Sequence, residues 1–413
     1  MSFKDLKLNK PLLRAIAESG YDNPTLVQEK TIPLVLDKKD VITSAQTGTG
    51  KTAAFALPIL QLLFDYQDAP KKGKKIKALI VSPTRELAVQ IASNLKTYSK
   101  YTNIRTAVVF GGTSIEPQKD ILKKGVDILI ATPGRLLDLH KQDLINLDYI
   151  QILVLDEADL MLDMGFIDDV KKIERLCPET KQTLLFSATI PYKVEQLANT
   201  ILKDPKRIEV TPNASTSKNV NQALYYVPKR NKIELCLHLL RNTIKGNIII
   251  FRRTKFGVDK LEKTLLKNGY LVGSIHGDKT QSDRQKALVN FKMNKVNILV
   301  ATDVAARGID IDNLDAVINF DLPNVPETYV HRIGRTARAG NKGVAYSFCS
   351  ADEKSYVKSI QQLIQLQLDV VEDHPYPLDP KVKPIVHTSK TPKSKYKKGR
   401  KSEASKKKKK RWY

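Results

Sequence analysis

Short apolar runs alternate with stretches of helical spacing along most of the chain. In the first half these runs are VITS (41–44), ALIVS (78–82), AVVF (107–110), DILIAT (127–132), ILVLD (152–156) and TLLFSAT (183–189). Runs of Val, Ile and Leu without polar alternation are typical of strands covered on both faces, as in a parallel sheet between two layers of helices. The first half of the chain therefore predicts an α/β domain.

The same pattern returns in the second half. Its runs are NIIIF (247–251), NILVAT (297–302), AVINFD (316–321) and GVAYSFC (343–349). Between the two series, residues 204–222 gather Pro, Ser, Thr and Asn and lose helical spacing, which favours a connector. The pattern predicts a first domain over 1–209, a linker over 210–219 and a second domain over 220–375, with a surface loop at 65–75.

The charge of the chain is strongly and unevenly positive. The 69 Lys and Arg against 44 Asp and Glu give a net charge of +25, which favours a polyanionic partner such as nucleic acid. Residues 381–413 alone carry fifteen Lys and Arg and one Glu, a net charge of +14. Self-repulsion and the lack of apolar residues predict a disordered basic tail over 376–413, which would act as a tether.

Composition excludes several classes of protein. A hydrophobic content of 41% is near the globular average and excludes a wholly disordered chain. No apolar run approaches the roughly 18 residues of a membrane span, and the N-terminus lacks the apolar core of a signal peptide, so a cytoplasmic protein is expected. Cys177, Cys236 and Cys349 are isolated, which predicts three reduced thiols and no CxxC metal site.

The strongest local motif is AQTGTGKT, which follows the run VITS and precedes a helix-like stretch. In such a loop, glycines turn backbone N–H groups onto phosphate, Lys51 meets the terminal phosphates and Thr52 ligates Mg²⁺. Ala45 stands where the strict P-loop pattern has Gly, and a plain Gly-rich turn from strand to helix is the alternative. The predicted phosphate loop consists of Ala45, Gln46, Thr47, Gly48, Thr49, Gly50, Lys51 and Thr52.

A second motif, Asp-Glu-Ala-Asp at 156–159, directly follows the run ILVL. In P-loop enzymes an Asp at the end of a strand holds the metal, and an adjacent Glu polarises the attacking water. Asp156 is the predicted Mg²⁺ ligand and Glu157 the catalytic residue. Taken alone, these acids would equally suit the start of a helix, where the macrodipole favours negative charge.

These motifs belong to a longer series that resembles the DEAD-box RNA helicases over residues 3 to 350. In order, the series is Phe3, GY (20–21), PT (24–25), Gln28, AQTGTGKT, PTREL (83–87), GG (111–112), TPGR (132–135), DEAD, SAT (187–189), FRRT (251–254), ATDVAARGID (301–310) and HRIGRTAR (331–338). The opening MSFKDLKLNKPLLRAIAESGY and the stretch DEADLMLDMGF also resemble the bacterial RhlE-type subfamily. Ala337 replaces a commoner Gly, and Arg252-Arg253 make their motif unusually basic.

The resemblance implies two RecA-like domains, each a mostly parallel sheet flanked by helices, with ATP and Mg²⁺ between them. The Gln28 amide, both donor and acceptor, suits the two-sided edge of adenine, and Phe3 or Tyr21 offers a stacking face. ATP is therefore expected rather than GTP. Asp310 is expected to reach the ribose, with Gly308 beside it.

The second domain is expected to complete catalysis. Arg335 and Arg338 resemble arginine fingers, whose permanent charge suits the γ-phosphate once the domains close. Without such a context, two arginines three residues apart usually lie on a solvated helix face or form salt bridges. Ser187 and Thr189 are expected to couple hydrolysis to strand separation; alternatively, they satisfy backbone groups at a strand end.

RNA is expected on a face away from the nucleotide, held by hydroxyls, small residues and single arginines. Such groups hold sugar and phosphate without reading bases, and contact with a 2′-OH would favour RNA over DNA. The predicted RNA-binding residues are Pro83, Thr84, Arg85, Gly111, Gly112, Thr132, Pro133, Gly134, Arg135, Thr254, Gln281, Arg284 and Thr302.

The resemblance implies an ATP-dependent RNA helicase that opens short duplexes or remodels RNA–protein complexes by RNA-stimulated hydrolysis. Two alternatives stay open: a DNA-directed P-loop ATPase, and a non-catalytic RNA clamp or scaffold. A monomeric core is expected, with ribosome-assembly or RNA-decay proteins as candidate partners.

Overall fold

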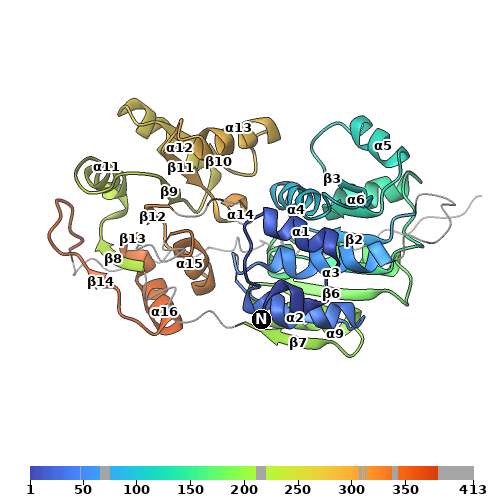
Figure 1. Cartoon of the computed structure of the whole chain (residues 1–413). Coiled ribbons are helices and arrows are strands. Elements are labelled where there is room, and N and C mark those ends of the chain that lie inside the picture. Colours follow the sequence, from blue (N-terminus) through green and yellow to red (C-terminus); the bar gives the residue numbers. More distant parts are fainter. Residues whose placement is uncertain are drawn as a thin grey trace, which may run out of the picture.

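Two parallel sheets, each between layers of helices, make up the computed structural model (Figure 1). The structure describes residues 1–46, 48–65, 75–210, 220–306, 309, 311, 314–336 and 343–379. The predicted fold class is confirmed.

The first sheet has seven parallel strands in the order β3-β4-β2-β5-β6-β1-β7. They are β1 (Val41–Ser44), β2 (Ala78–Val81), β3 (Thr106–Val109), β4 (Ile128–Ala131), β5 (Ile152–Leu155), β6 (Gln182–Ser187) and β7 (Lys206–Glu209). Every residue of β2, β4, β5 and β6 is buried, as the unbroken apolar runs predict.

The helices of this domain cover both faces of its sheet. They are the 3₁₀ helix η1 (Phe3–Leu6) and helices α1 (Lys10–Glu18), α2 (Leu26–Leu36), α3 (Lys51–Asp65), α4 (Arg85–Tyr98), α5 (Glu116–Lys123), α6 (Pro133–Lys141), α7 (Ala158–Asp163), α8 (Ile167–Arg175) and α9 (Tyr192–Ile201). Helices α1 to α4 pack with Ile80 and Val154 on one face, and α6 to α9 pack with Leu79 and Leu153 on the other. Neighbouring strand residues therefore enter opposite cores.

The second sheet repeats this plan, with seven parallel strands in the order β10-β11-β9-β12-β13-β8-β14. They are β8 (Val220–Tyr226), β9 (Ile248–Phe251), β10 (Val272–Ile275), β11 (Ile298–Ala301), β12 (Ala316–Asn319), β13 (Gly343–Cys349) and β14 (Asp369–Val370). Its helical elements are η2 (Lys229–Asn231), α11 (Lys232–Asn242), α12 (Lys255–Lys267), α13 (Gln281–Lys292), α14 (Asp303–Ala306), α15 (Pro326–Ile333), η3 (Ala351–Glu353) and α16 (Lys354–Ile364).

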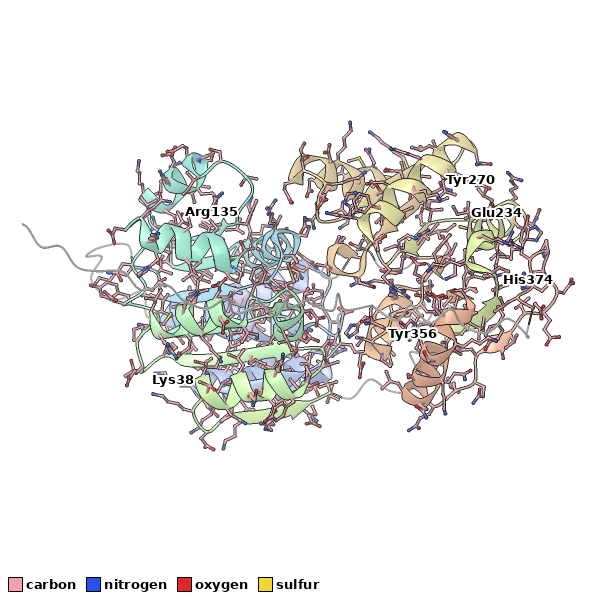
Figure 2. All side chains as sticks on the ribbon, turned by 180° about the vertical axis from the view of Figure 1, so that it is seen from behind. Lys38, Arg135, Glu234, Tyr270, Tyr356 and His374 are labelled. Carbon is pink, nitrogen blue, oxygen red and sulfur yellow. The ribbon has the colours of Figure 1, made fainter. Side chains whose placement is uncertain are left out.

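One predicted boundary needs correction, that of the tail. Strand β7 and the start of β8 lie at the two ends of the stretch 204–222, outside the predicted linker at 210–219; edge strand β7 buries only Ile208 and so lacks an apolar run. The tail predicted from 376 begins later, since the Leu378 N–H donates to the Tyr226 carbonyl at 2.9 Å. The ring of His374, labelled in Figure 2, packs on Tyr225 at 5.5 Å between centroids. Most of the linker (211–219), the surface loop (66–74) and the tail (380–413) lie outside the described residues.

Other expectations concern thiols and membranes. All three cysteines are free and buried, and burial raises the pKa of each thiol to about 12. In the part of the chain that the structure describes, no helix is long and apolar enough to cross a membrane.

Parallel strands bring the predicted motifs to one edge of each sheet. The P-loop follows β1, PTREL follows β2, TPGR follows β4, DEAD follows β5, and SAT begins at the last residue of β6. Because parallel strands end at the same edge, motifs far apart in sequence lie side by side.

Candidate functional site

A cavity of about 330 Å³ lies at the carboxyl ends of the first sheet's strands, between the two domains. The first domain contributes Gln28, Lys51 and Asp156 among others, and the second contributes Ile309 and Arg335. Residues predicted to bind or hydrolyse ATP thus share one cavity.

The phosphate loop owes its shape to two glycines. Gly48 and Gly50 have φ values of 80° and 89°, in the left-handed region that favours glycine. A Cβ at Gly50 would also collide with Nε2 of Gln28. The loop is fixed at its start, where the buried Ala45 donates its N–H to the Ser187 carbonyl at 3.0 Å. Within it, Thr49 Oγ1 donates to the Gln46 carbonyl at 2.8 Å; Thr47 lies outside the described residues.

Lys51 and Glu157 form a buried ion pair, with Nζ and Oε1 2.7 Å apart. Burial alone would lower the pKa of Lys51, but the charges of Glu157 and Asp156 outweigh burial and raise it. Glu157 has a φ of 54°, unusual for a residue with a side chain. Glu157 is the residue directly before α7, and its side chain contacts Lys51 of the P-loop.

Asp156 fits a metal ligand. Its Oδ1 is buried and has no hydrogen-bond partner among the described residues. Burial and the neighbouring Glu157 raise the pKa of its carboxyl group and outweigh the opposing charge of Lys51, so a bound cation would stabilise the anion. Thr52 lines the same cavity. Within the described ranges no group of three His, Cys, Asp or Glu side chains is placed to hold a metal, so Mg²⁺ here would depend on phosphate and water oxygens.

Asp159 joins the DEAD and SAT motifs. Its Oδ2 accepts hydrogen bonds from both the N–H and the Oγ1 of Thr189 at 3.0 Å, and its own N–H donates to Ser187 Oγ at 3.1 Å. Burial would raise the pKa of Asp159, but Lys51 and His331 of the second domain outweigh burial and hold it below its ordinary value. Both predicted coupling hydroxyls therefore contact this motif.

Gln28 lines the cavity but is already bonded within the protein. Its Nε2 donates to the Gly50 carbonyl at 3.2 Å, and its Oε1 accepts from the Thr25 N–H at 2.9 Å. Tyr21 also lines the cavity and is 42% exposed. Phe3 is only 5% exposed, packs in the core and is not a lining residue. The geometry favours Tyr21 as the stacking residue.

The second domain reaches the cavity through Arg335. This side chain is 6% exposed, and its Nη1 donates to the Ile309 carbonyl at 2.7 Å. Arg338, Gly308 and Asp310 lie outside the described residues, so their predicted roles stay predictions.

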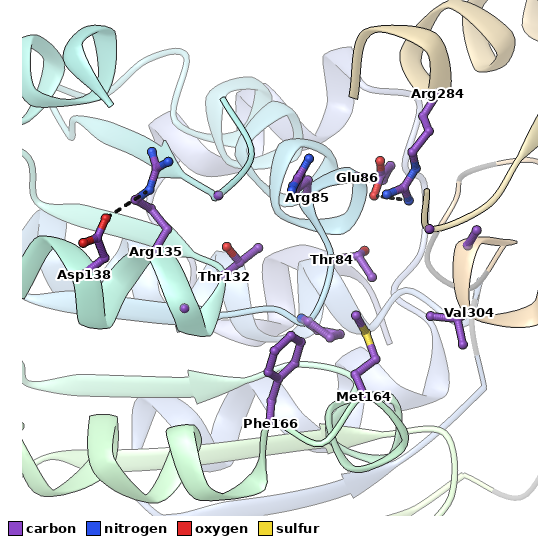
Figure 3. Close-up of a pocket in the computed structure, with 15 residues that line it drawn as sticks. Thr84, Arg85, Glu86, Thr132, Arg135, Asp138, Met164, Phe166, Arg284 and Val304 are labelled. Atoms are coloured by element: carbon purple, nitrogen blue, oxygen red, sulfur yellow. Dashed lines mark ion pairs between the residues drawn. The ribbon is translucent and has the colours of Figure 1, made fainter. Parts of the chain in front are cut away.

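A second cavity, of about 510 Å³, lies beside the first and is also shared by both domains (Figure 3). Met164, Phe166 and Val304 give it an apolar part. Burial lowers the pKa of Arg85, and the nearby Arg284 lowers it further, as expected where positive charge is crowded. Eight predicted RNA-binding residues line this cavity, namely Pro83, Thr84, Arg85, Gly111, Thr132, Gly134, Arg135 and Arg284.

The other predicted RNA-binding residues have local structural contacts. A Cβ at Gly112 would collide with the Arg85 guanidinium. Pro133 begins α6, and Thr254 caps α12 by accepting the Gly257 N–H at 3.1 Å. The Thr302 N–H donates to the Ile275 carbonyl at 3.3 Å.

Gln281 and Arg284 of α13 bind α4 of the first domain. Gln281 Nε2 donates to Glu86 Oε1 at 3.0 Å, and Arg85 Nη1 donates to Gln281 Oε1 at 3.2 Å. Arg284 Nη2 lies 3.0 Å from Glu86 Oε2, the ion pair marked in Figure 3. These contacts close the two domains beside the second cavity.

Sequence reasoning gave no role to Glu86, Asp303 or Arg332. Arg332 is 2% exposed, and it pairs with both carboxylate oxygens of Asp303 at 2.6 and 2.8 Å. This bond ties α15 to α14, the segment that precedes Ile309. All three residues stand inside quoted motifs, but a single Glu, Asp or Arg does not reveal its partner. The basic Arg252 is also used internally, 2.9 Å from Asp321 Oδ2.

Comparison with known proteins agrees with this geometry. The family model for the DEAD/DEAH box helicase matches residues 25–197, and that for the helicase conserved C-terminal domain matches residues 231–340. The ATP-dependent RNA helicase CshA of Limosilactobacillus reuteri is 44% identical over 370 residues, which is 89% of this chain and 73% of CshA. The relatives do not specify the RhlE-type subfamily, which stays a prediction.

Solved structures show the same two-domain arrangement. Mss116p bound to single-stranded RNA and AMP-PNP matches with a TM-score of 0.82 and 31% identity, covering 91% of this chain and 80% of that one. S. cerevisiae Dbp5 bound to RNA and ADP BeF3 matches with a TM-score of 0.79 and 32% identity, covering 90% and 95%. On this evidence the chain belongs to the DEAD-box family of ATP-dependent RNA helicases.

Proposed function

We propose that this enzyme hydrolyses ATP in the smaller cavity when RNA occupies the larger one, and that closure of the two domains couples both events to local duplex opening. One observation carries the proposal: each cavity is lined by both domains. A ligand that spans two domains favours the closed arrangement, so ATP and RNA binding become reciprocally coupled.

In this proposal the first domain holds the reactants. The P-loop and Lys51 bind the phosphates, Thr52 and Asp156 hold Mg²⁺, and Glu157 orients the attacking water. Bound Mg²⁺ would neutralise charge on the phosphates. Because Lys51 and Glu157 form an ion pair, an incoming γ-phosphate competes for the lysine and releases the glutamate.

The second domain supplies the remaining charge. Arg335 stabilises the charge that develops on the γ-phosphate, and Arg338 is proposed to assist it. Asp159, held by Ser187 and Thr189 and in the field of His331, is the proposed link between the nucleotide and domain closure.

RNA is proposed to lie in the larger cavity and to be held by its backbone. Arg85, Arg135 and Arg284 suit phosphates, and Thr84 and Thr132 suit sugar or phosphate oxygens. Binding is then sequence-tolerant and salt-sensitive. The tail is proposed as an additional RNA tether, and the cytoplasm as the location.

A non-catalytic clamp is the second candidate, because the larger cavity alone could hold RNA. The meeting of Lys51, Glu157 and Arg335 in one cavity argues against it, since a clamp needs none of these groups.

Strand separation tests the proposal. A short RNA duplex with a single-stranded overhang is incubated with ATP, with a non-hydrolysable analogue, or without nucleotide. We expect separation with ATP, little without nucleotide, and less on a DNA duplex of the same sequence. Equal separation without nucleotide would favour the clamp, and a preference for the DNA duplex would favour the DNA-directed alternative.

A further inference from the structure

Helix α4 connects the two cavities. Arg85 and Glu86 at its start line the larger cavity, while residues from Leu87 onward line the smaller one. The residues of α4 that line the smaller cavity are Leu87, Gln90, Ile91, Asn94 and Tyr98. Residues four apart lie on the same face of a helix, so Gln90, Asn94 and Tyr98 form a polar stripe along the cavity wall.

The two amides in this stripe have unused hydrogen-bonding capacity. Gln90 and Asn94 are half-buried, and neither side chain has a hydrogen-bond partner among the described residues. A primary amide provides two donors and an acceptor. Half-buried amides without a protein partner, facing a cavity with Lys51 and Gln28, are suited to a ligand in that cavity.

The position of the stripe indicates which part of a ligand it would meet. The Tyr98 hydroxyl lies 3.4 Å from the hydroxyl of Tyr21. Tyr21 is the aromatic residue that the geometry favours for stacking on the base. Asn94 is four residues from Tyr98, or about 6 Å along the helix axis. Neutral amides also suit ring nitrogens and hydroxyls better than phosphate, whose charge Lys51 already matches.

The residue expected to read adenine leaves room for this contribution. Both functional atoms of the Gln28 side chain are engaged, Oε1 by Thr25 and Nε2 by the Gly50 carbonyl. One N–H and one lone pair of this amide are left for a base. Neighbouring amides can supply further donors and acceptors to the other polar groups of a nucleoside.

We propose that Gln90 and Asn94 hydrogen-bond the nucleoside part of the bound nucleotide and so contribute to its affinity. The proposal rests on the assignment of the smaller cavity to ATP. It adds a wall of helix α4 to the binding site, and the same helix carries the Glu86 and Arg85 contacts to the second domain.

The test separates the nucleoside from the phosphates. The Kd values of ATP, ADP and inorganic tripolyphosphate are measured by calorimetry on the full chain without RNA. The variants are Gln90→Ala, Asn94→Ala and the double substitution, since alanine favours the helix. Ser93→Ala, on the exposed side of α4, is the matched control. Lys51→Ala tests the cavity itself.

We expect each single substitution to raise the Kd of ATP and ADP about three- to tenfold, the double more, and the Kd of tripolyphosphate to stay unchanged. Unchanged Kd values for ATP and ADP, or an equal rise for tripolyphosphate, would overturn the inference. Lys51→Ala should weaken all three ligands; if it weakens none, the assignment of the cavity is wrong as well.

Discussion

Glu86 in the first domain pairs with Arg284 in the second, with 3.0 Å between Oε2 and Nη2. The side chains are only 5% and 13% exposed, so solvent screens the pair weakly. Arg284 also lines the larger cavity, so the ion pair joins domain closure to the proposed RNA site. Sites that share such a contact are expected to influence each other's ligands.

Neutralising this pair should impair the closed state. For Glu86→Gln we expect the kcat of RNA-stimulated ATP hydrolysis to fall about tenfold or more, because a largely buried arginine loses its counter-charge. Steady-state turnover at saturating RNA and ATP measures the effect. The control is Glu116→Gln, which breaks an exposed pair with Lys119 and should leave kcat unchanged. The same kcat for Glu86→Gln and Glu116→Gln would contradict a role of the interdomain pair in hydrolysis.

Gly50 should be required both for loop shape and for space. Gly50→Ala places a side chain at a φ of 89° and against Gln28 Nε2. Gly269→Ala is a matched control, since that glycine has a φ of 83° and open space around it. We expect both variants to lose about 1 kcal/mol of unfolding free energy, and only Gly50→Ala to raise the KM for ATP. Unfolding curves measure the stability of both variants, and ATP titrations measure their KM. An unchanged KM in Gly50→Ala would contradict the close packing of Gly50 against Gln28.

The Thr189 hydroxyl should matter more for duplex opening than for hydrolysis. Thr189→Val keeps the side-chain shape but removes the hydrogen bond to Asp159 Oδ2, leaving only that from the backbone N–H. We expect the unwinding rate to fall several-fold more than the ATPase rate, because the link to domain closure is weakened. Thr200→Val, whose hydroxyl bonds only its own helix, is the control. A parallel loss of both rates would contradict coupling through this bond.

Much of this arrangement could be predicted because parallel strands gather their carboxyl ends. The P-loop and DEAD motifs follow apolar runs and the SAT motif ends one, so the carboxyl ends of the parallel strands bring Lys51, Glu157 and Ser187 to one edge of the sheet. Partnerships across the domains could not be predicted in this way. Nothing in PTREL shows that Glu86 binds Gln281 and Arg284, since such pairs depend on how two separate sheets dock.

The sequence also could not show which of two aromatic residues stacks on the base, or where the edge strands lie. Phe3 and Tyr21 were equal candidates for stacking, but burial separates them, with 5% against 42% exposure. Strand β10, VGSI, contains Gly and Ser and occupies a sheet edge, so it lacks the unbroken apolar run of the central strands. Unbroken apolar runs in a sequence therefore reveal the central strands of a sheet more readily than its edge strands.

A buried charge cluster should stabilise the second domain. Lys232 is 1% exposed, and its Nζ donates to Glu353 Oε2 at 2.6 Å and to the Phe320 carbonyl at 2.8 Å. Lys232→Met leaves Glu353 with Arg253 as its remaining charged partner. We expect a loss of about 2 to 4 kcal/mol in urea unfolding of the full chain. Lys229→Met, at an exposed pair with Asp352, should change little, and a similar small change for Lys232→Met would contradict the prediction.

The central claim is that ATP hydrolysis depends on RNA because both domains must close. ATP turnover measured with and without a generic single-stranded RNA tests it most directly, beside Glu157→Gln and a DNA strand of the same sequence. The account predicts strong stimulation by RNA, weak stimulation by DNA and no turnover in the variant. Salt-sensitive RNA binding without any ATP turnover would contradict it and leave an RNA clamp.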